Sequence, residues 1–340
     1  MGIWEKMPKS FHDSLDTHLN FKSPRNPGYD VVETIRAMET KKVRFFMALG
    51  GNFLSASPDT ERTSKAIEKC SMTVQISTKL NRSHCIVGEK SLILPCLVRS
   101  EEDRQEDEKQ IISTENSMGI VQSSLGIFKP ISSNLKSEIE ILCKIAIKLF
   151  PERSDTFEGF FKNHDQIRDM IEKVIPGFES YNLRVRKRGG FSLPNGPKKR
   201  KFKTKSGKAL FTSNEILKNN YADDILILQT LRSHDQFNTT VYGLEDRYRG
   251  IYNDRNVIMM NEDDMTSRSI KPLMEVDVVS LFKGKERHLR NLKAVPYKMP
   301  RGACAAYFPE ANVLVPLDKT AKVSNTPTSK DVPVKISQSK

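Results

Sequence analysis

The chain has 340 residues, of which 37% are hydrophobic and 29% charged, and its formal net charge is +13. This length allows roughly two domains, and this apolar share excludes a chain that is disordered throughout. The longest apolar runs, such as Ile225–Leu228, are too short to cross a bilayer, and the N-terminus has no apolar secretion signal, so a cytoplasmic protein without a membrane span is expected.

Most of the net charge comes from one segment. Residues 184–208 contain eleven basic side chains and no acidic one: Arg184, Arg186, Lys187, Arg188, Lys198, Lys199, Arg200, Lys201, Lys203, Lys205 and Lys208. Subtracting these eleven charges from +13 leaves about +2 for the rest of the chain. The segment is also rich in glycine and proline, which indicates a linker.

Five cysteines are spread along the chain without a CxxC pair. This spacing predicts neither a zinc site nor an iron–sulfur site within the sequence. The odd number favours reduced thiols over a disulfide framework, so we expect the cysteines to be mostly small core residues.

The first half is predicted to form a parallel α/β layer. Residues 1–29 are expected to be irregular because of Pro8, Pro24 and Pro27, and Asp30 is expected to cap a helix. Alternating strands and helices favour a parallel sheet with crossover helices. The expected elements are a strand at Val43–Leu49, a helix from Ser57 to Cys70, strands at Met72–Ile76 and Ser91–Leu94, and helices at Asn134–Phe150 and Asp165–Val174.

The pattern changes after Lys208, where short apolar runs are separated by turn residues. This spacing is typical of a β-rich domain, and a barrel is the favoured architecture. The expected strands are Ile225–Leu228, Val257–Met260, Val276–Phe282, Val313–Val315 and Val332–Ile336.

Three polar segments follow predicted strands: Gly50–Asn52, Ser77–His84 and the loop of Leu228–Gly250. Glycine amides can approach a phosphate closely, and ligands of α/β sheets gather beyond the carboxyl ends of the strands. Taken alone, Gly50–Asn52 is better explained as an ordinary tight turn, and the loop of Leu228–Gly250 is equally consistent with a solvated surface loop. Ser233, His234 and Asp235 are adjacent in sequence, but a hydrolase triad requires convergence in space, and no GxSxG motif is present.

Seven segments of the chain occur in a characteristic order. They are GIWEKMP at 2–8, FMALGGNFLSASPDTE at 46–61, VQISTKLNRSH at 74–84, LILP at 92–95, TKSGKALF at 204–211, LQTLRSHDQFNTTVYGLEDRYRG at 228–250 and YFPEANVLVP at 307–316. In their order and combination these segments resemble the C-terminal half of molybdopterin-dependent oxidoreductases. The nearest group is the formate-dehydrogenase-like one often called the FdhF/YdeP type.

The resemblance implies an α/β, parallel-sheet Rossmann-like domain followed by a double-psi-type β-barrel domain. The expected boundaries are 1–180 for the α/β domain, 181–204 for the basic linker and 205–340 for the barrel domain. The implied cofactor is molybdenum held by two molybdopterin guanine dinucleotides, and the implied reaction is a two-electron oxidation or reduction. The implied cofactor-binding residues are Gly51, Asn52, Ser77, Thr78, Asn81, Thr230, Arg232, His234, Gln236, Asn238, Thr239, Asn312 and Lys330.

Members of this family begin several hundred residues earlier. Their [4Fe-4S] cysteines, any protein ligand of the metal and the substrate funnel belong to that earlier part. We therefore expect a chain that is incomplete and inactive alone, encoded by a split gene, a truncated pseudogene or an incomplete gene model, with a separately encoded N-terminal half as a candidate partner. The alternatives are a non-catalytic protein that binds a polyanion such as nucleic acid, or a protein partner, through residues 184–208, and a fragment that does not fold stably. Nucleic acid is the less favoured partner, because the sequence contains no recognisable nucleic-acid-binding module.

Overall fold

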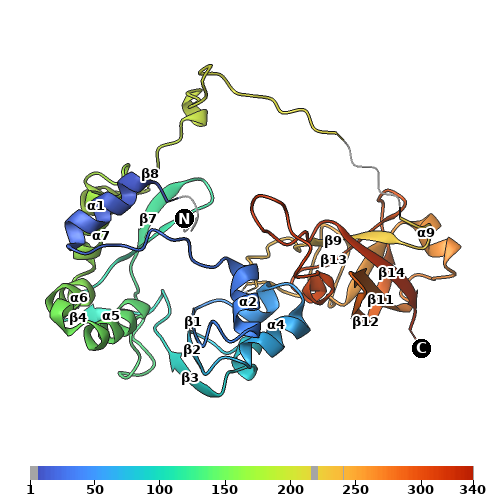
Figure 1. The fold of residues 1–340 in the computed structure, drawn as a ribbon, viewed down its shortest axis with the longest axis horizontal. Coiled ribbons are helices and arrows are strands. Elements are labelled where there is room, and N and C mark those ends of the chain that lie inside the picture. Colours follow the sequence, from blue (N-terminus) through green and yellow to red (C-terminus); the bar gives the residue numbers. More distant parts are fainter. Residues whose placement is uncertain (1–6, 216–220, 240, 340) are drawn as a thin grey trace. The chain divides into compact units, whose positions relative to one another are not determined.

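A computed structural model describes residues 7–215, 221–239 and 241–339. Most of the motif at 2–8, and Thr240 of the polar loop, lie outside these residues. The chain divides into two compact units (Figure 1), namely unit 1 (residues 1–28 and 95–217) and unit 2 (residues 29–94 and 218–340). The division places residues 29–94 with the barrel, and the domain boundaries expected from the sequence stay a prediction.

Unit 2 begins with the expected parallel α/β layer. Its elements are α2 (Val31–Glu39), β1 (Phe45–Leu49), α3 (Phe53–Ala56), α4 (Thr60–Ile67), β2 (Met72–Ser77), η1 (Arg82–Cys85) and β3 (Lys90–Pro95). The sheet order is β1-β2-β3, and β1 and β2 are parallel from Phe45↔Met72 to Leu49↔Ile76. Asp30 caps α2 as predicted, because its carboxylate accepts a hydrogen bond of 2.8 Å from the amide of Glu33.

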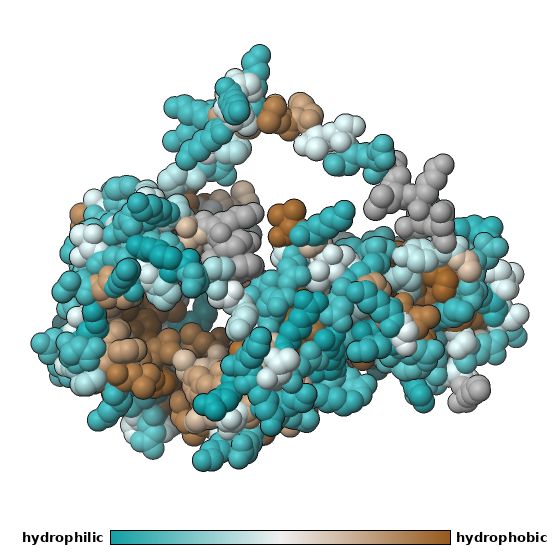
Figure 2. Space-filling model, in the orientation of Figure 1, coloured by the Kyte–Doolittle hydropathy of each residue, from teal (hydrophilic) through white to brown (hydrophobic). Residues whose placement is uncertain are grey.

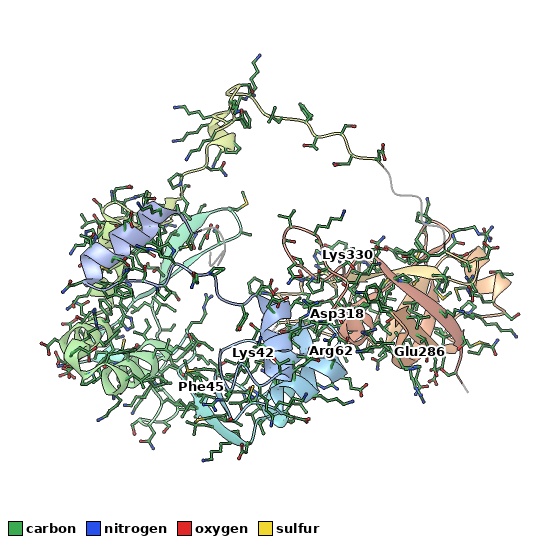
Figure 3. The ribbon with its side chains drawn as sticks, viewed as in Figure 1. Lys42, Phe45, Arg62, Glu286, Asp318 and Lys330 are labelled. Atoms are coloured by element: carbon green, nitrogen blue, oxygen red, sulfur yellow. The ribbon has the colours of Figure 1, made fainter. Side chains whose placement is uncertain are left out.

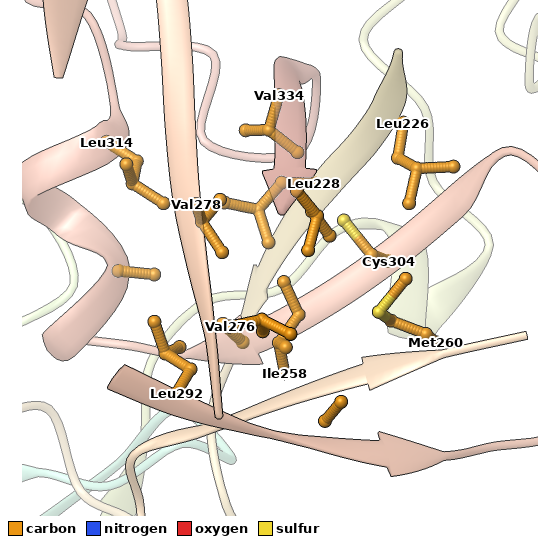
Figure 4. Packing of buried hydrophobic residues seen from close by; sticks show 14 of the residues in the cluster. Leu226, Leu228, Ile258, Met260, Val276, Val278, Leu292, Cys304, Leu314 and Val334 are labelled. Atoms are coloured by element: carbon orange, nitrogen blue, oxygen red, sulfur yellow. The ribbon is translucent and has the colours of Figure 1, made fainter. Parts of the chain in front are cut away.

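The remainder of unit 2 is a closed six-stranded barrel, which confirms the expected fold class. Its strands are β9 (Leu226–Leu231), β10 (Val257–Met260), β11 (Glu275–Phe282), β12 (Lys285–Pro296), β13 (Ala303–Tyr307) and β14 (Val332–Gln338), with the helices α9 (Glu262–Ser267) and η4 (Glu310–Leu314). The strand order is β10-β12-β11-β14-β9-β13, with β10/β12 and β13/β9 parallel. Alternate side chains point inward and form one apolar core (Figure 4).

Two local predictions are wrong. Residues 313–315 do not form a strand, because Glu310–Leu314 winds into a 3-10 helix in which the amide of Asn312 donates to the carbonyl of Pro309. Residues 1–29 are not uniformly irregular, because α1 (Lys9–Leu19) lies within them. This helix carries Phe11, Leu15 and Leu19 at helical spacing, and none of its residues is buried.

Charged side chains join the α/β layer to the barrel within unit 2. Asp318 accepts hydrogen bonds from Arg36 at 2.8 Å and Arg62 at 2.5 Å (Figure 3). Arg287 of β12 donates to the carboxylate of Asp59, which precedes α4, at 2.7 Å, and both residues are buried. These contacts fix the helices of the layer against one side of the barrel.

Unit 1 contains mostly short elements. These are α1, β4 (Arg104–Gln105), β5 (Glu108–Lys109), β6 (Ile112–Glu115), β7 (Ile120–Ser124), α5 (Glu138–Leu149), η2 (Pro151–Arg153), α6 (Ser154–Lys162), α7 (His164–Val174), α8 (Tyr181–Val185), β8 (Phe191–Ser192) and η3 (Pro197–Lys199). The start of the expected linker is packed, because Tyr181, Val185 and Phe191 are buried with Val121 in one apolar cluster. Residues 194–215 are mostly exposed, and this segment is largely hydrophilic in Figure 2.

The cysteines are free, and four of the five are buried, as expected for small core residues. Burial raises the pKa of the Cys96 thiol to about 11. Among the described helices, none is long and apolar enough to span a bilayer.

A buried histidine gives unit 1 a predicted pH dependence. His164 is 1% exposed, both of its ring nitrogens lack a hydrogen-bond partner, and its Nε2 lies 3.6 Å from the carboxylate of Asp103. Burial lowers the pKa of His164 below its ordinary value of 6.5, although Asp103 opposes this shift. The unfolded chain therefore binds the proton first, and unit 1 should lose stability as the pH falls below about 6.5.

The measurement is urea unfolding from pH 7.5 to 5.5, followed by peptide-resolved hydrogen exchange in unit 1. His164→Gln should flatten the dependence, whereas the exposed His18 on α1 provides the control His18→Gln, which should leave it unchanged. An equal slope in wild type and His164→Gln would contradict the prediction.

Candidate functional site

The turn after β1 presents backbone amides and an amide side chain. Gly50 and Gly51 have φ values of +64° and +72°, a region that favours glycine, and the amide of Gly50 donates to the carbonyl of Ile76 at 2.8 Å. Asn52 caps α3: its side-chain oxygen accepts hydrogen bonds from the Ser55 amide at 3.3 Å and the Ser83 hydroxyl at 2.8 Å. The turn is therefore held from two sides.

The segment after β2 closes on this turn. The side-chain nitrogen of Asn81 donates to the carbonyl of Gly51 at 2.8 Å, and its oxygen accepts from the Ser83 amide at 2.9 Å. Ser77 donates to the carbonyl of Lys79 at 2.7 Å, and Thr78 is exposed on the same turn. The structure thus brings Gly51, Asn52 and Asn81 together, while Ser77 and Thr78 remain at the end of β2.

The loop after β9 is ordered by its own polar side chains. Arg232 donates to the side-chain oxygen of Asn238 at 2.7 Å, and Gln236 donates to the Asn238 carbonyl at 2.9 Å. The carboxamide oxygen of Gln236 accepts a 2.9 Å hydrogen bond from the Ser233 amide. His234 is partly exposed and stacks on Tyr248, with ring centroids 3.9 Å apart. Because these groups bind one another, the loop has a defined shape before any ligand arrives.

Lys330 lies beside the start of this loop (Figure 3). Its ammonium group donates to the carbonyl of Thr230, whose side chain is on the buried face of β9. Burial and the neighbouring Arg232 lower the pKa of Lys330. The segment that carries Lys330 also pairs with β9, because the amide of Thr230 donates to the carbonyl of Ser329 at 3.0 Å.

Thr239 lies at the tip of a hairpin that closes between Phe237 and Val241. The tip reaches an open cleft of about 920 Å³ within unit 2, between the α/β layer and the barrel. The polar side chains that line the cleft include Asn52, Asn81, Thr239, Arg82, His288 and Arg290, and also the carboxylates of Glu61, Glu68 and Glu310. Hydroxyl, amide, cationic and carboxylate groups from several separate segments therefore line one space.

Asn312 is buried, and its side-chain nitrogen donates to the carbonyl of Ser55 at 2.7 Å. Its own carbonyl accepts a hydrogen bond of 3.0 Å from the amide of Asp59. Asn312 thus ties η4 to the α/β layer at the cleft. Its expected role in cofactor binding stays a prediction.

Sequence reasoning missed the cations of the cleft wall and one buried arginine. Arg82 lies within the polar segment Ser77–His84, which was predicted to face a ligand, but His288 and Arg290 belong to β12, which was not predicted as a strand. Arg255 precedes β10 in a polar stretch and has no motif around it. None of these residues has a spacing signal in the sequence, because distant segments bring them to the site.

No cluster of three or more His, Cys, Asp or Glu side chains within residues 7–215, 221–239 and 241–339 is arranged to hold a metal ion. The cleft instead offers groups for a polar organic ligand. Amides and hydroxyls can pair with polar ring edges, and the side chains of Arg82 and Arg290 can neutralise phosphate, although Glu61, Glu68 and Glu310 line the same cleft.

Comparison with known proteins shows which family part of this chain matches. Residues 226–333 match the family described as the molydopterin dinucleotide binding domain. An uncharacterized oxidoreductase of Mycobacterium tuberculosis is 46% identical over 343 residues, which cover 99% of this chain and 44% of the relative. Protein YdeP of Escherichia coli is 36% identical over 345 residues, which cover 100% of this chain and 46% of that protein. The chain thus spans less than half the length of these curated relatives.

The fold has a counterpart among solved structures. Acetylene hydratase from Pelobacter acetylenicus superposes with a TM-score of 0.63 over 97% of this chain and 50% of that enzyme, at 14% sequence identity. At this identity the likeness concerns the fold alone.

Proposed function

We propose that unit 2 holds a dinucleotide arm of the cofactor in its cleft, because the chain corresponds to the C-terminal part of a molybdopterin-dependent oxidoreductase. The observation that carries the proposal is the convergence of Asn52, Asn81 and Thr239 on one cleft. These residues come from three segments that the family resemblance selects independently. The form of the cofactor that we propose is the guanine dinucleotide bound to molybdenum.

The side chains of the cleft fit such a ligand. Arg82 and Arg290 can neutralise a pyrophosphate, and an amide side chain offers the donor and acceptor that a guanine edge requires. Gly51 precedes Asn52 of the cleft, and apart from its chain neighbours no atom lies within 4 Å of a Cβ built on it, so a ligand can approach the backbone there. The volume of about 920 Å³ suits one dinucleotide rather than two.

Bound molybdenum would supply two-electron redox chemistry at the metal, in the manner of formate oxidation. The residues of this chain would bind the dinucleotide, orient it and exclude water from its phosphates. A [4Fe-4S] cluster in the whole protein would take its ligands from outside the described residues, in which no metal-binding cluster is found.

Thr239→Val tests the proposal with an isosteric change. It removes one hydroxyl from the cleft, and the loss of one hydrogen bond is worth about 0.5–1.5 kcal/mol, or roughly two- to tenfold in dinucleotide affinity. The measurement is titration of the purified chain with molybdopterin guanine dinucleotide, followed by pterin fluorescence. Thr212→Val, at an exposed position of unit 1, is the matched control and should bind as wild type does.

A second control separates this function from polyanion binding. Of the eleven basic residues in 184–208, all within a described range, only Arg184 and Arg186 form ion pairs. Replacing the lysines from Lys198 to Lys208 with glutamine should leave dinucleotide affinity unchanged. A wild-type chain that binds no dinucleotide but binds polyanions with a steep salt dependence would reverse the assignment.

A further inference from the structure

Arg255 is a buried cation that connects the loop after β9 to the wall of the cleft. Its residue is 5% exposed and lies just before β10. Its Nη1 atom donates to the hydroxyl of Ser233 at 2.8 Å, and its Nη2 atom donates to the side-chain oxygen of Gln236 at 3.2 Å. The guanidinium group therefore holds two side chains at the turn of that loop.

The same group reaches the segment before η4. Its Nε atom donates to one carboxylate oxygen of Glu310 at 2.7 Å, and Nη2 donates to the other at 3.1 Å. Nη2 also donates to the carbonyl of Phe308 at 2.8 Å. Because Glu310 lines the cleft, Arg255 joins the cleft wall to the loop through one rigid planar group.

Two aromatic rings complete the surroundings of this cation. The guanidinium carbon lies 4.4 Å from the ring centroid of Tyr242 and 4.6 Å from that of Tyr307. Tyr242 lines the cleft, and Tyr307 is buried in β13. Cation–π attraction of this kind strengthens as the charge is desolvated, so the rings hold the guanidinium plane in place.

The backbone of the loop enters the left-handed region twice. Asp235 and Asn238 have φ values of +61° and +48°, a conformation that aspartate and asparagine adopt more readily than other non-glycine residues. Asn238 neighbours Thr239, the residue of the loop that reaches the cleft. A loop that is already held in this shape loses less entropy when a ligand binds.

We propose that Arg255 is a positioning residue that fixes the loop of residues 232–239 against residues 308–310 in the shape that receives the dinucleotide. This inference rests on the proposed function. Arg255 lies outside the motifs identified in the sequence, yet by holding the loop it would determine how tightly the cleft binds the dinucleotide.

The most informative variant is Arg255→Lys, because it keeps the positive charge and removes the planar guanidinium group. A lysine ammonium has three donors on a flexible stem and cannot reproduce the planar five-donor pattern that binds Ser233, Gln236 and Glu310 together. We expect dinucleotide affinity to fall at least tenfold. We also expect faster hydrogen exchange in peptides covering 232–239 and 308–310, with unchanged exchange in β11 and β14.

Arg268→Lys is the matched control, because Arg268 lies after α9, outside the cleft, and donates to the carbonyl of Asp264 at 3.1 Å. It should alter neither affinity nor loop exchange. Ser233→Ala removes a single acceptor of Arg255 and serves if Arg255→Lys does not fold. It should produce a smaller loss of affinity and faster exchange confined to the loop.

The two proposals fail in different ways. A wild-type chain that binds no dinucleotide overturns the proposed function and this inference with it. Wild-type affinity in Arg255→Lys, or in Ser233→Ala if the lysine variant does not fold, overturns the positioning role and leaves the proposed function standing. Faster exchange throughout unit 2, with affinity unchanged for the folded fraction, would reduce Arg255 to a purely structural residue.

Discussion

Arg287→Met will destabilise unit 2 by about 3–5 kcal/mol, the usual cost of leaving one member of a buried ion pair without its partner. Arg287 and Asp59 are 7% and 6% exposed, and their side chains meet at 2.7 Å. Without the guanidinium group, the carboxylate of Asp59 stays buried and uncompensated. Urea unfolding with peptide-resolved hydrogen exchange in β12 and α4 measures the loss.

The double variant Asp59→Asn with Arg287→Met should recover most of that stability, because neither charge then remains buried. The exposed pair of Lys65 and Glu61 provides the control: its side chains are 69% and 76% exposed, so Lys65→Met should leave the unfolding curve unchanged. A single variant as stable as wild type would show that water already solvates Asp59.

This ion pair also bears on the cleft. Arg287 is followed by His288, and Asp59 is followed by α4, which carries Glu61, Ser64 and Lys65; all four of these residues line the cleft. Loosening the pair should therefore widen the distribution of cleft shapes. We expect dinucleotide affinity to fall in parallel with the local stability of β12, and not with the stability of unit 1.

The sequence predicts elements well where the local pattern is sufficient. The strand at Val257–Met260 has the predicted bounds, and α7 begins one residue before the predicted Asp165. Both have a strong apolar pattern in the sequence. The strand is a continuous apolar run whose residues are all buried, and the helix has apolar residues along one face. The approach of Asn81 to Gly51 also follows from local reasoning, because adjacent parallel strands end at one edge of the sheet.

Elements decided by distant partners could not be predicted in this way. The strand β12 has the charged sequence KERHLRNLKAVP and becomes a strand because it pairs with β11 on one side and β10 on the other. The partners of Arg255 and Arg287 are likewise remote, since Asp59 is separated from Arg287 by 228 residues. A single sequence contains no signal for such pairs.

Leu228→Ala tests the barrel itself, with an expected loss of about 2–5 kcal/mol. Leu228 is 0% exposed in the centre of β9, where Cys304 of β13 and Val332 of β14 are its strand partners (Figure 4). Removing three carbons from a closed barrel leaves a cavity, because the hydrogen-bonded wall cannot collapse into it. Thermal and urea unfolding should both shift, and hydrogen exchange should accelerate throughout the strands of unit 2.

Leu281→Ala is the matched control in the same barrel, since Leu281 of β11 is 52% exposed and its truncation creates no cavity. It should change stability by less than about 1 kcal/mol. Because β9 runs directly into the loop that begins at Arg232, Leu228→Ala should also weaken dinucleotide binding. If hydrogen exchange accelerated in β9 while the other strands kept their protection, the six strands would not unfold as one cooperative unit. Any loss of dinucleotide affinity would then arise from a local change in the loop that follows β9, and not from unfolding of the barrel.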